Sequence, residues 1–160
     1  MRTIKFKAKA LEDGEWIVGD LVCANGETCI KPESESGDIL HICNEVDPDT
    51  VCQFTGFLDK NGKEIYEGDV LRSDECPFSF TEDNLHDNYY GVIGWSEEEA
   101  LFCMVAAKNP KSSVRGIFDG ISDSISQRMM QGFEVIGNVH DEEWKQYREY
   151  IQEENEEQHQ

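Results

Sequence analysis

The residues best suited to chemistry are acidic side chains in the first half of the chain. Five carboxylates are candidates for a shared site: Asp47, Asp49, Glu67, Asp69 and Asp74. If they converged within a few ångströms, they could hold a divalent cation and support hydrolysis. Asp69 follows Gly68, however, and an Asp at a turn commonly accepts hydrogen bonds from nearby backbone N–H groups. Turn chemistry therefore explains this carboxylate more simply than catalysis does.

Other metal and catalytic patterns are weaker still. The segment Asp59-Lys60-Asn61-Gly62-Lys63 is not an EF-hand loop, since Lys63 occupies a ligand position and Gly62 comes too early. His41 lies in a predicted strand, where a single His is usually structural, and His86-Asp87 has no nucleophile beside it. We therefore assign no catalytic, metal-binding or cofactor-binding residue.

Six cysteines are scattered through the chain: Cys23, Cys29, Cys43, Cys52, Cys76 and Cys103. No two have the Cys-x-x-Cys spacing of a zinc site. The chain starts with alternating Ile/Phe/Ala and Lys rather than an apolar signal sequence, which favours a reducing cytoplasm. We expect reduced thiols, with Cys43 and Cys52 as small core residues.

Charge is the strongest compositional signal. The 160 residues carry a formal net charge of −20, and the segment 73–100 has eight acidic residues and no Lys or Arg. Such a surface repels phosphates, so direct binding to DNA or RNA is not expected. The dense basic row Lys5, Lys7 and Lys9 is too short to reverse this. A protein partner with a basic surface, or mimicry of nucleic acid, fits the charge. No apolar stretch is long enough for a membrane helix.

These residues must be positioned by strands, because alternation with a period of two recurs along the chain. The expected strands span residues 4–10, 16–23, 28–30, 39–43, 51–57, 64–66, 69–72, 89–95, 100–106 and 133–139. Asn25-Gly26 and Asn61-Gly62 predict tight turns, since both residue types tolerate positive φ. In the strand 89–95, alternation places Trp95 and Ile93 on the face opposite Tyr90. The segment 73–88 is expected to be a long loop, in which Phe78, Phe80 and Leu85 could dock.

Two helices are expected near the end of the chain. Ser122 is predicted to cap a helix over 123–131, which Gly132 would end. Asp141 is predicted to cap a terminal helix whose apolar face carries Trp144, Tyr147 and Ile151. Residues 153–160 are Glu, Gln, Asn and His without an apolar side chain, which predicts a disordered acidic tail.

The central stretch resembles the YopX family, whose members are encoded by bacteriophages and prophages. The similarity lies in residues 50–56 and 59–70, supported by an early strand at 16–21 and a late one at 133–140. The resemblance implies no catalytic residues, because the family has no assigned activity. It marks a set of motif residues with structural roles: Gln53, Phe54, Thr55, Gly56, Asn61, Gly62, Tyr66, Gly68 and Asp69.

The resulting fold prediction is mainly β. An N-terminal antiparallel hairpin sheet would pack on a small SH3-like barrel closed by a C-terminal helix, with a single antiparallel β-sandwich as the alternative. One YopX-like domain would span 1–152, with an N-terminal β subregion at 1–50, a barrel-like subregion at 51–140, a helix at 141–152 and the tail at 153–160.

The predicted function is that of a non-enzymatic phage or prophage accessory protein. It would work without cofactors by binding a host or phage protein with a basic surface, and self-association stays open. The alternative is an acidic nucleic-acid mimic that blocks a DNA-binding protein. A divalent-metal-dependent hydrolase is the least favoured function.

Overall fold

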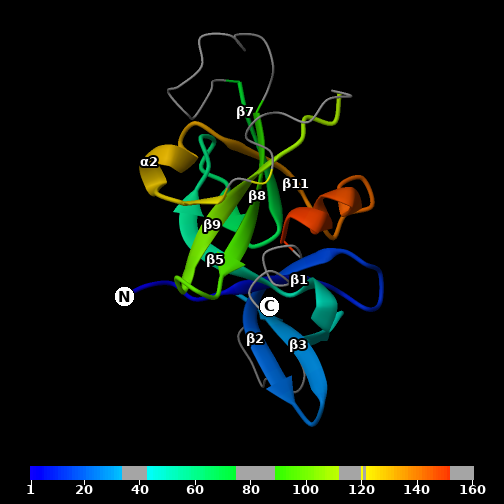
Figure 1. Cartoon of the computed structure of the whole chain (residues 1–160). Coiled ribbons are helices and arrows are strands. Elements are labelled where there is room, and N and C mark those ends of the chain that lie inside the picture. The colour runs from blue at the N-terminus through cyan, green and yellow to red at the C-terminus, as the bar shows by residue number, and fades with distance from the viewer. Residues whose placement is uncertain (34–42, 75–88, 112–119, 121, 152–160) are drawn as a thin grey trace, which may run out of the picture. The chain divides into compact units, whose positions relative to one another are not determined.

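The computed structural model describes residues 1–33, 43–74, 89–111, 120 and 122–151. The chain divides into two compact units, Met1–Gly56 and Phe57–Gln160 (Figure 1). Both are built from antiparallel strands with short helical turns. The predictions of a mainly β fold, an N-terminal antiparallel sheet and a terminal helical segment are confirmed.

The first unit is a sheet of hairpins. Its strands follow the order β4-β3-β2-β1-β5. Their bounds are β1 Phe6–Lys9, β2 Trp16–Ala24, β3 Glu27–Pro32, β4 Asn44–Glu45 and β5 Cys52–Leu58, with a short 3₁₀ helix, η1, at Pro48–Thr50. The turn between β2 and β3 has Asn25 at φ 55° and Gly26 at φ 84°, which confirms the prediction made from that dipeptide.

The core of the first unit lies on one face of this sheet. Ala8, Ile30 and Val46 are almost fully buried there. The half-buried residues Phe6, Ile17, Leu21 and Val51 pack against them. Since successive residues of a strand point to opposite faces, Lys7 and Lys9 of β1 lie on the face opposite Ala8.

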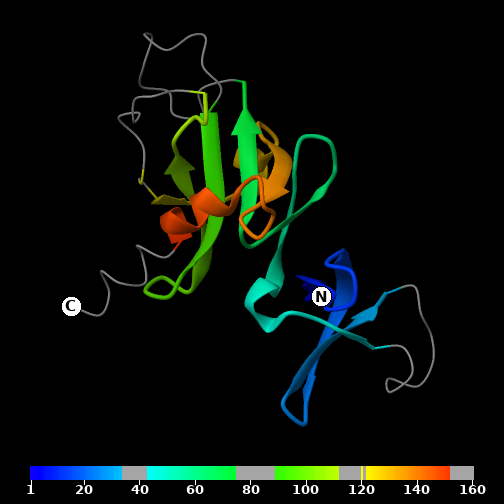
Figure 2. The same ribbon diagram turned by 90° about the vertical axis from the view of Figure 1, so that its right-hand side faces the viewer.

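The second unit is an open sheet with the strand order β10-β9-β8-β7-β11 (Figure 2). Its strands are β7 Asp69–Ser73, β8 Tyr89–Ser96, β9 Leu101–Ala107, β10 Ser122–Ser124 and β11 Glu134–Asn138. The short strand β6, Glu64–Tyr66, pairs with β5, whose last residues belong to this unit. No pairing between the edge strands β10 and β11 appears among the described residues, so the arrangement is a sheet and not a closed barrel.

Both faces of the second sheet are covered. On one face, Val70, Tyr90, Val92 and Val105 form a core with Tyr147 and Tyr150. On the other, Leu71, Ile93 and Met104 pack with Met130 and Phe133. This is why β8 and β9 are buried on both sides along most of their length, and it confirms the alternation predicted for Tyr90 and Ile93.

The expected helix over 123–131 is wrong in its first part. Residues Ser122–Ser124 form β10 and pair with β9, with Asp123 opposite Met104. The helix α2 is one turn, Gln127–Met130, and its N-cap is Ser126, whose hydroxyl accepts from Met129 N at 3.3 Å. Pairing with the edge of β9 therefore overrides the local helical pattern.

The end of the chain also begins its helix later than expected. Asp141 does not cap it, because its carboxylate accepts from Asn138 N at 3.0 Å and closes a turn. A 3₁₀ helix, η2, spans Lys145–Arg148, and residues 149–151 continue in α-helical conformation. The predicted apolar face is confirmed, since Trp144, Tyr147 and Ile151 all pack on the second sheet.

Several expectations lie outside the described residues. They concern most of the strand at 39–43 with His41, the segment 75–88 with Cys76, Phe78, Phe80, Leu85, His86 and Asp87, and the tail at 153–160.

Candidate functional site

The motif residues predicted to be structural fall into two groups, one in each unit. In the first unit, Gln53 of β5 pairs with Phe6 of β1, and Phe54 N donates to Lys5 O at 2.9 Å. Phe54 and Thr55 are buried. Gly56 is the last residue of the unit and has φ 91°, a backbone conformation that strains any residue other than glycine.

In the second unit, Asp59 organises the turn that contains Asn61 and Gly62. Its Oδ1 accepts from Asn61 N at 2.7 Å and Lys63 N at 2.9 Å, and its Oδ2 accepts from Val135 N at 3.0 Å. Gly62 has φ 78°, as predicted, but Asn61 does not have positive φ. A carboxylate that caps three N–H groups makes a second left-handed residue unnecessary.

Asp69 is fully buried and organises the second half of the motif. Its Oδ2 accepts from Tyr66 N at 2.8 Å and its Oδ1 from Asn138 Nδ2 at 3.0 Å. Asn138 Nδ2 also donates to Glu67 O at 3.1 Å. A Cβ on Gly68 would lie 3.2 Å from Asn138 and from Val139, in addition to the strain at φ 73°. The pair therefore has a structural role: Gly68 allows close packing, and Asp69 accepts buried hydrogen bonds.

Asn138 is the partner that sequence reasoning did not single out. It comes from β11, 69 positions after Asp69. The only sequence signal was its place in the late strand that resembles the family, and nothing local indicates a buried amide.

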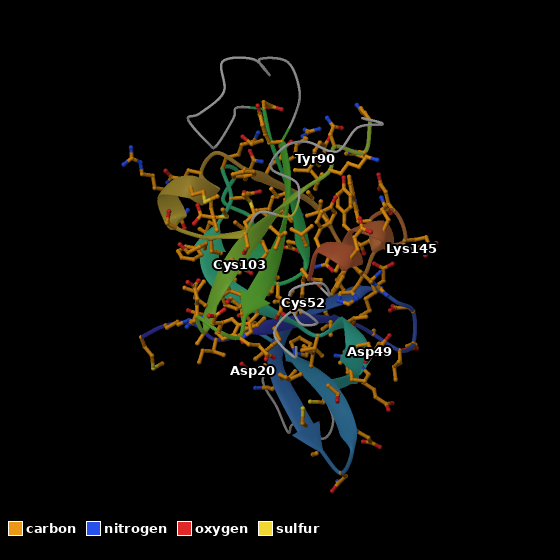
Figure 3. All side chains as sticks on the ribbon, viewed as in Figure 1. Asp20, Asp49, Cys52, Tyr90, Cys103 and Lys145 are labelled. Atoms are coloured by element: carbon orange, nitrogen blue, oxygen red, sulfur yellow. The ribbon has the colours of Figure 1, made fainter. Side chains whose placement is uncertain are left out.

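The remaining candidate carboxylates have separate structural environments. Asp47 Oδ1 accepts from Asp49 N at 3.0 Å and caps η1, whose position is visible in Figure 3 through the label on Asp49. Asp74 lies 3.7 Å from Lys60 Nζ in the second unit. Within the described ranges, no group of three or more His, Cys, Asp or Glu is placed to hold a metal ion.

One charged network joins the turn at Asp59 to β7 and β11. Arg72 hydrogen-bonds Glu134 directly across the strand pair, and Lys60 Nζ lies 3.6 Å from Glu134 Oε2. The hydrogen bond from Arg72 is the main cause that holds the pKa of Glu134 below its usual value of 4.5. This network stabilises the sheet and leaves Glu134 without the properties of a general acid at neutral pH.

The described cysteines are Cys23, Cys29, Cys43, Cys52 and Cys103, and no disulfide joins any two of them. Cys52 is buried, as expected for a core residue, whereas Cys43 is half-buried. Burial raises the pKa of Cys29, and the neighbouring Cys43, Glu27 and Glu45 raise it further. A thiol with a raised pKa is a poor nucleophile at neutral pH.

The polar surface shows two opposite kinds of charge. On the first unit, Lys7 Nζ and Lys9 Nζ lie 4.7 Å and 5.3 Å from the centre of the Trp16 ring. On the second unit, the turn between β8 and β9 exposes Glu97, Glu98 and Glu99. The ammonium groups of the first unit lie over an aromatic ring, which attracts them through its quadrupole, whereas the acidic groups of the second unit are exposed to solvent.

Two antiparallel sheets define the class of protein, and the second unit also has a buried Gly-Asp motif and a short C-terminal helical segment packed on its sheet. The chain belongs to the YopX family, since the family model "YopX protein" matches residues 5–143. A solved structure, "Crystal structure of protein EF1440 from Enterococcus faecalis", is similar at 20% identity with a TM-score of 0.41, covering 88% of this chain and 95% of that chain. No protein with a curated description matches the sequence. Among the described residues, no helix has the length and apolar character needed to cross a membrane.

Proposed function

We propose that this YopX-family chain is a non-enzymatic accessory protein of a phage or prophage, which works inside a bacterial host by binding a protein with a basic surface. One observation carries the proposal. The three adjacent carboxylates Glu97, Glu98 and Glu99 are exposed and form no ion pair with any residue that the structure describes.

The contrast with the buried carboxylates supports a binding role. The carboxylate oxygens of Asp59 and Asp69 accept hydrogen bonds from backbone and side-chain amide N–H groups, as those of structural residues do. The side chains of Glu97–Glu99 have no such partner among the residues that the structure describes. Acidic groups held on a rigid hairpin attract a basic partner over long distances and accelerate association.

The test is affinity capture from the natural host, followed by a salt titration of the purified pair. Electrostatic attraction between oppositely charged surfaces is screened beyond about 8 Å at 0.15 M salt. We therefore expect affinity to fall as salt rises, mainly through a slower association rate. A partner whose affinity ignores salt, or the absence of any stoichiometric protein partner, would contradict the proposal.

A gel-shift with duplex and single-stranded DNA is the companion experiment. No shift is expected at physiological salt, because a net charge of −20 opposes phosphate binding. If the captured partner itself binds DNA, competition between DNA and this chain would identify the nucleic-acid mimic. Simultaneous binding of both would identify an ordinary protein ligand.

A further inference from the structure

The tip of the β8–β9 hairpin combines an exposed aromatic ring with acidic side chains that form no ion pair with the described residues. Trp95 of β8 is directly opposite Phe102 of β9, and the two rings meet edge to face with centroids 5.0 Å apart. Phe102 is 7% exposed and belongs to the core, whereas Trp95 is 39% exposed. The indole is thus in contact with the core ring of Phe102 on one side, while part of its surface is open to solvent.

The indole Nε1–H and the ring face of Trp95 also have no polar or charged partner among the described residues. Among the described residues, no partner accepts a hydrogen bond from its Nε1 and no cation lies over its ring. Trp16 of the first unit is different, because Lys7 and Lys9 cover it. The half-buried indole of Trp16 is therefore covered by cations of the same unit, whereas the exposed indole of Trp95 has no cation over it among the described residues.

Three acidic residues follow the open indole closely in the sequence. Glu97, Glu98 and Glu99 follow Trp95 after a single residue, and all three side chains are exposed. Ser96 Oγ accepts from Glu99 N at 3.3 Å, which orders the turn. The sequence from 73 to 100 contains no Lys or Arg that could neutralise them locally.

We propose that this tip, Trp95 with Glu97, Glu98 and Glu99, is the docking site for an arginine-bearing segment of the basic protein partner. The proposal rests on the proposed function and specifies its surface. A guanidinium group stacks on an indole face and forms forked hydrogen bonds with a carboxylate, which an ammonium group cannot do. Trp and Arg dominate the energetics of protein interfaces, and a charged rim directs the approach.

The first experiment uses peptides as probes, so that it does not depend on a captured partner. ¹H–¹⁵N NMR spectra of the whole chain would be recorded with tetra-arginine, tetra-lysine and neutral tetra-citrulline. We expect tetra-arginine to shift the Trp95 indole N–H and the amides of residues 96–101, tetra-lysine to do so more weakly, and tetra-citrulline to leave them unchanged. Equal effects of the arginine and lysine peptides at every acidic segment would show only general charge attraction and overturn the site.

Two triple variants separate the site from net charge. Glu97→Lys/Glu98→Lys/Glu99→Lys reverses the tip, and Glu12→Lys/Glu15→Lys/Glu27→Lys reverses three exposed acids of the first unit with the same change in charge. We expect the tip variant to weaken tetra-arginine binding about tenfold or more and the control variant less than about threefold, since several contacts are lost at one place. Equal losses in both variants would overturn the proposal.

The aromatic contribution is tested with Trp95→Ser and, if that variant unfolds, with Trp95→Leu, which keeps an apolar side chain beside Phe102. Either change should weaken tetra-arginine binding and remove the preference over tetra-lysine. Retention of that preference would contradict the stacking arrangement.

The captured partner then distinguishes the two levels of the proposal. If it binds the parent and the control triple variant but not the tip variant, both the function and the surface are supported. If it binds the tip variant as well as the parent, the surface is wrong while protein binding stands. If no partner is captured although tetra-arginine binds at Trp95, the proposed function fails and only the chemical preference of the surface remains.

Discussion

A Cβ added at Gly137 tests how the terminal helical segment is fastened to the second sheet. Gly137 lies in β11 just after a bulge and faces the ring of Trp144. A Cβ at this position would lie 2.3 Å from Trp144 Cδ1 and 2.4 Å from Nε1, where a normal contact is about 3.5–4.0 Å. The ring must therefore move by more than about 1 Å.

Such a movement is opposed by the neighbours of the ring. Trp144 is packed beside Tyr147 at 5.4 Å and Tyr90 at 6.5 Å between ring centroids. Overpacking of this kind costs about 1–3 kcal/mol. Replacing glycine by alanine at an ordinary φ returns about 0.4–1 kcal/mol through the unfolded state. We expect Gly137→Ala to lower the free energy of unfolding by about 1–2 kcal/mol.

The assay is urea unfolding followed by far-ultraviolet circular dichroism, carried out as a double-mutant cycle. Trp144→Ala alone should cost about 3 kcal/mol, since a large packed ring is lost. In the Trp144→Ala background, Gly137→Ala should cost nothing or stabilise slightly, because the clash is absent. The coupling energy would equal the overpacking cost, about 1–3 kcal/mol. An equal cost of Gly137→Ala in both backgrounds would refute the packing argument.

Three further predictions concern the turn and the buried and paired carboxylates. Gly62→Val should destabilise by about 1 kcal/mol or more, and Gly62→Asn should be nearly neutral, because Asn tolerates φ near 78° best; equal losses in urea melts would contradict this. Asp69→Ala should cost about 3 kcal/mol, since Tyr66 N–H and Asn138 Nδ2–H lose a buried acceptor, and a loss below about 1 kcal/mol would show that water replaces the carboxylate. The folded state lowers the pKa of Glu134, so the ionised carboxylate should stabilise the fold by up to about 1 kcal/mol relative to Glu134→Gln. This stabilisation should be complete above pH 4.5 and should disappear as pH falls through the folded pKa. Glu98→Gln, at an exposed position, is the control.

Much of the fold could be predicted from local signals. The alternation around Tyr90 and Ile93 indicated a strand, and the structure shows both faces buried. Asn25-Gly26 and Gly62 indicated turns because positive φ is a property of the residue type. The spacing of Trp144 and Tyr147 indicated a packed helical face in the same way.

The errors arose where partners outside the predicted helix decide the outcome, one of them far along the chain and one only three positions away. Ser122 looked like a helix cap, but it pairs with Val105 of β9. Asp141 looked like another cap, but it accepts from Asn138. Alternation placed Trp95 on the same face as Ile93, and the structure buries Ile93 but leaves the Trp95 ring partly open at the end of the strand. Exposure at a hairpin tip depends on which elements cover it, and alternation cannot supply that information.

The bond between Asp59 and β11 has a consequence for the order of folding. Asp59 Oδ2 accepts from Val135 N, 76 positions later, and β11 completes the sheet by pairing with β7. While the chain is being synthesised, the turn at Asp59 leaves the ribosome long before its last partner exists. Closing so long a loop lowers the conformational entropy of the chain before the contacts that stabilise it can form. Contacts between residues far apart in the sequence therefore slow folding. The second unit should therefore reach its native state only after β11 has emerged, with β7 exposing an unpaired edge until then.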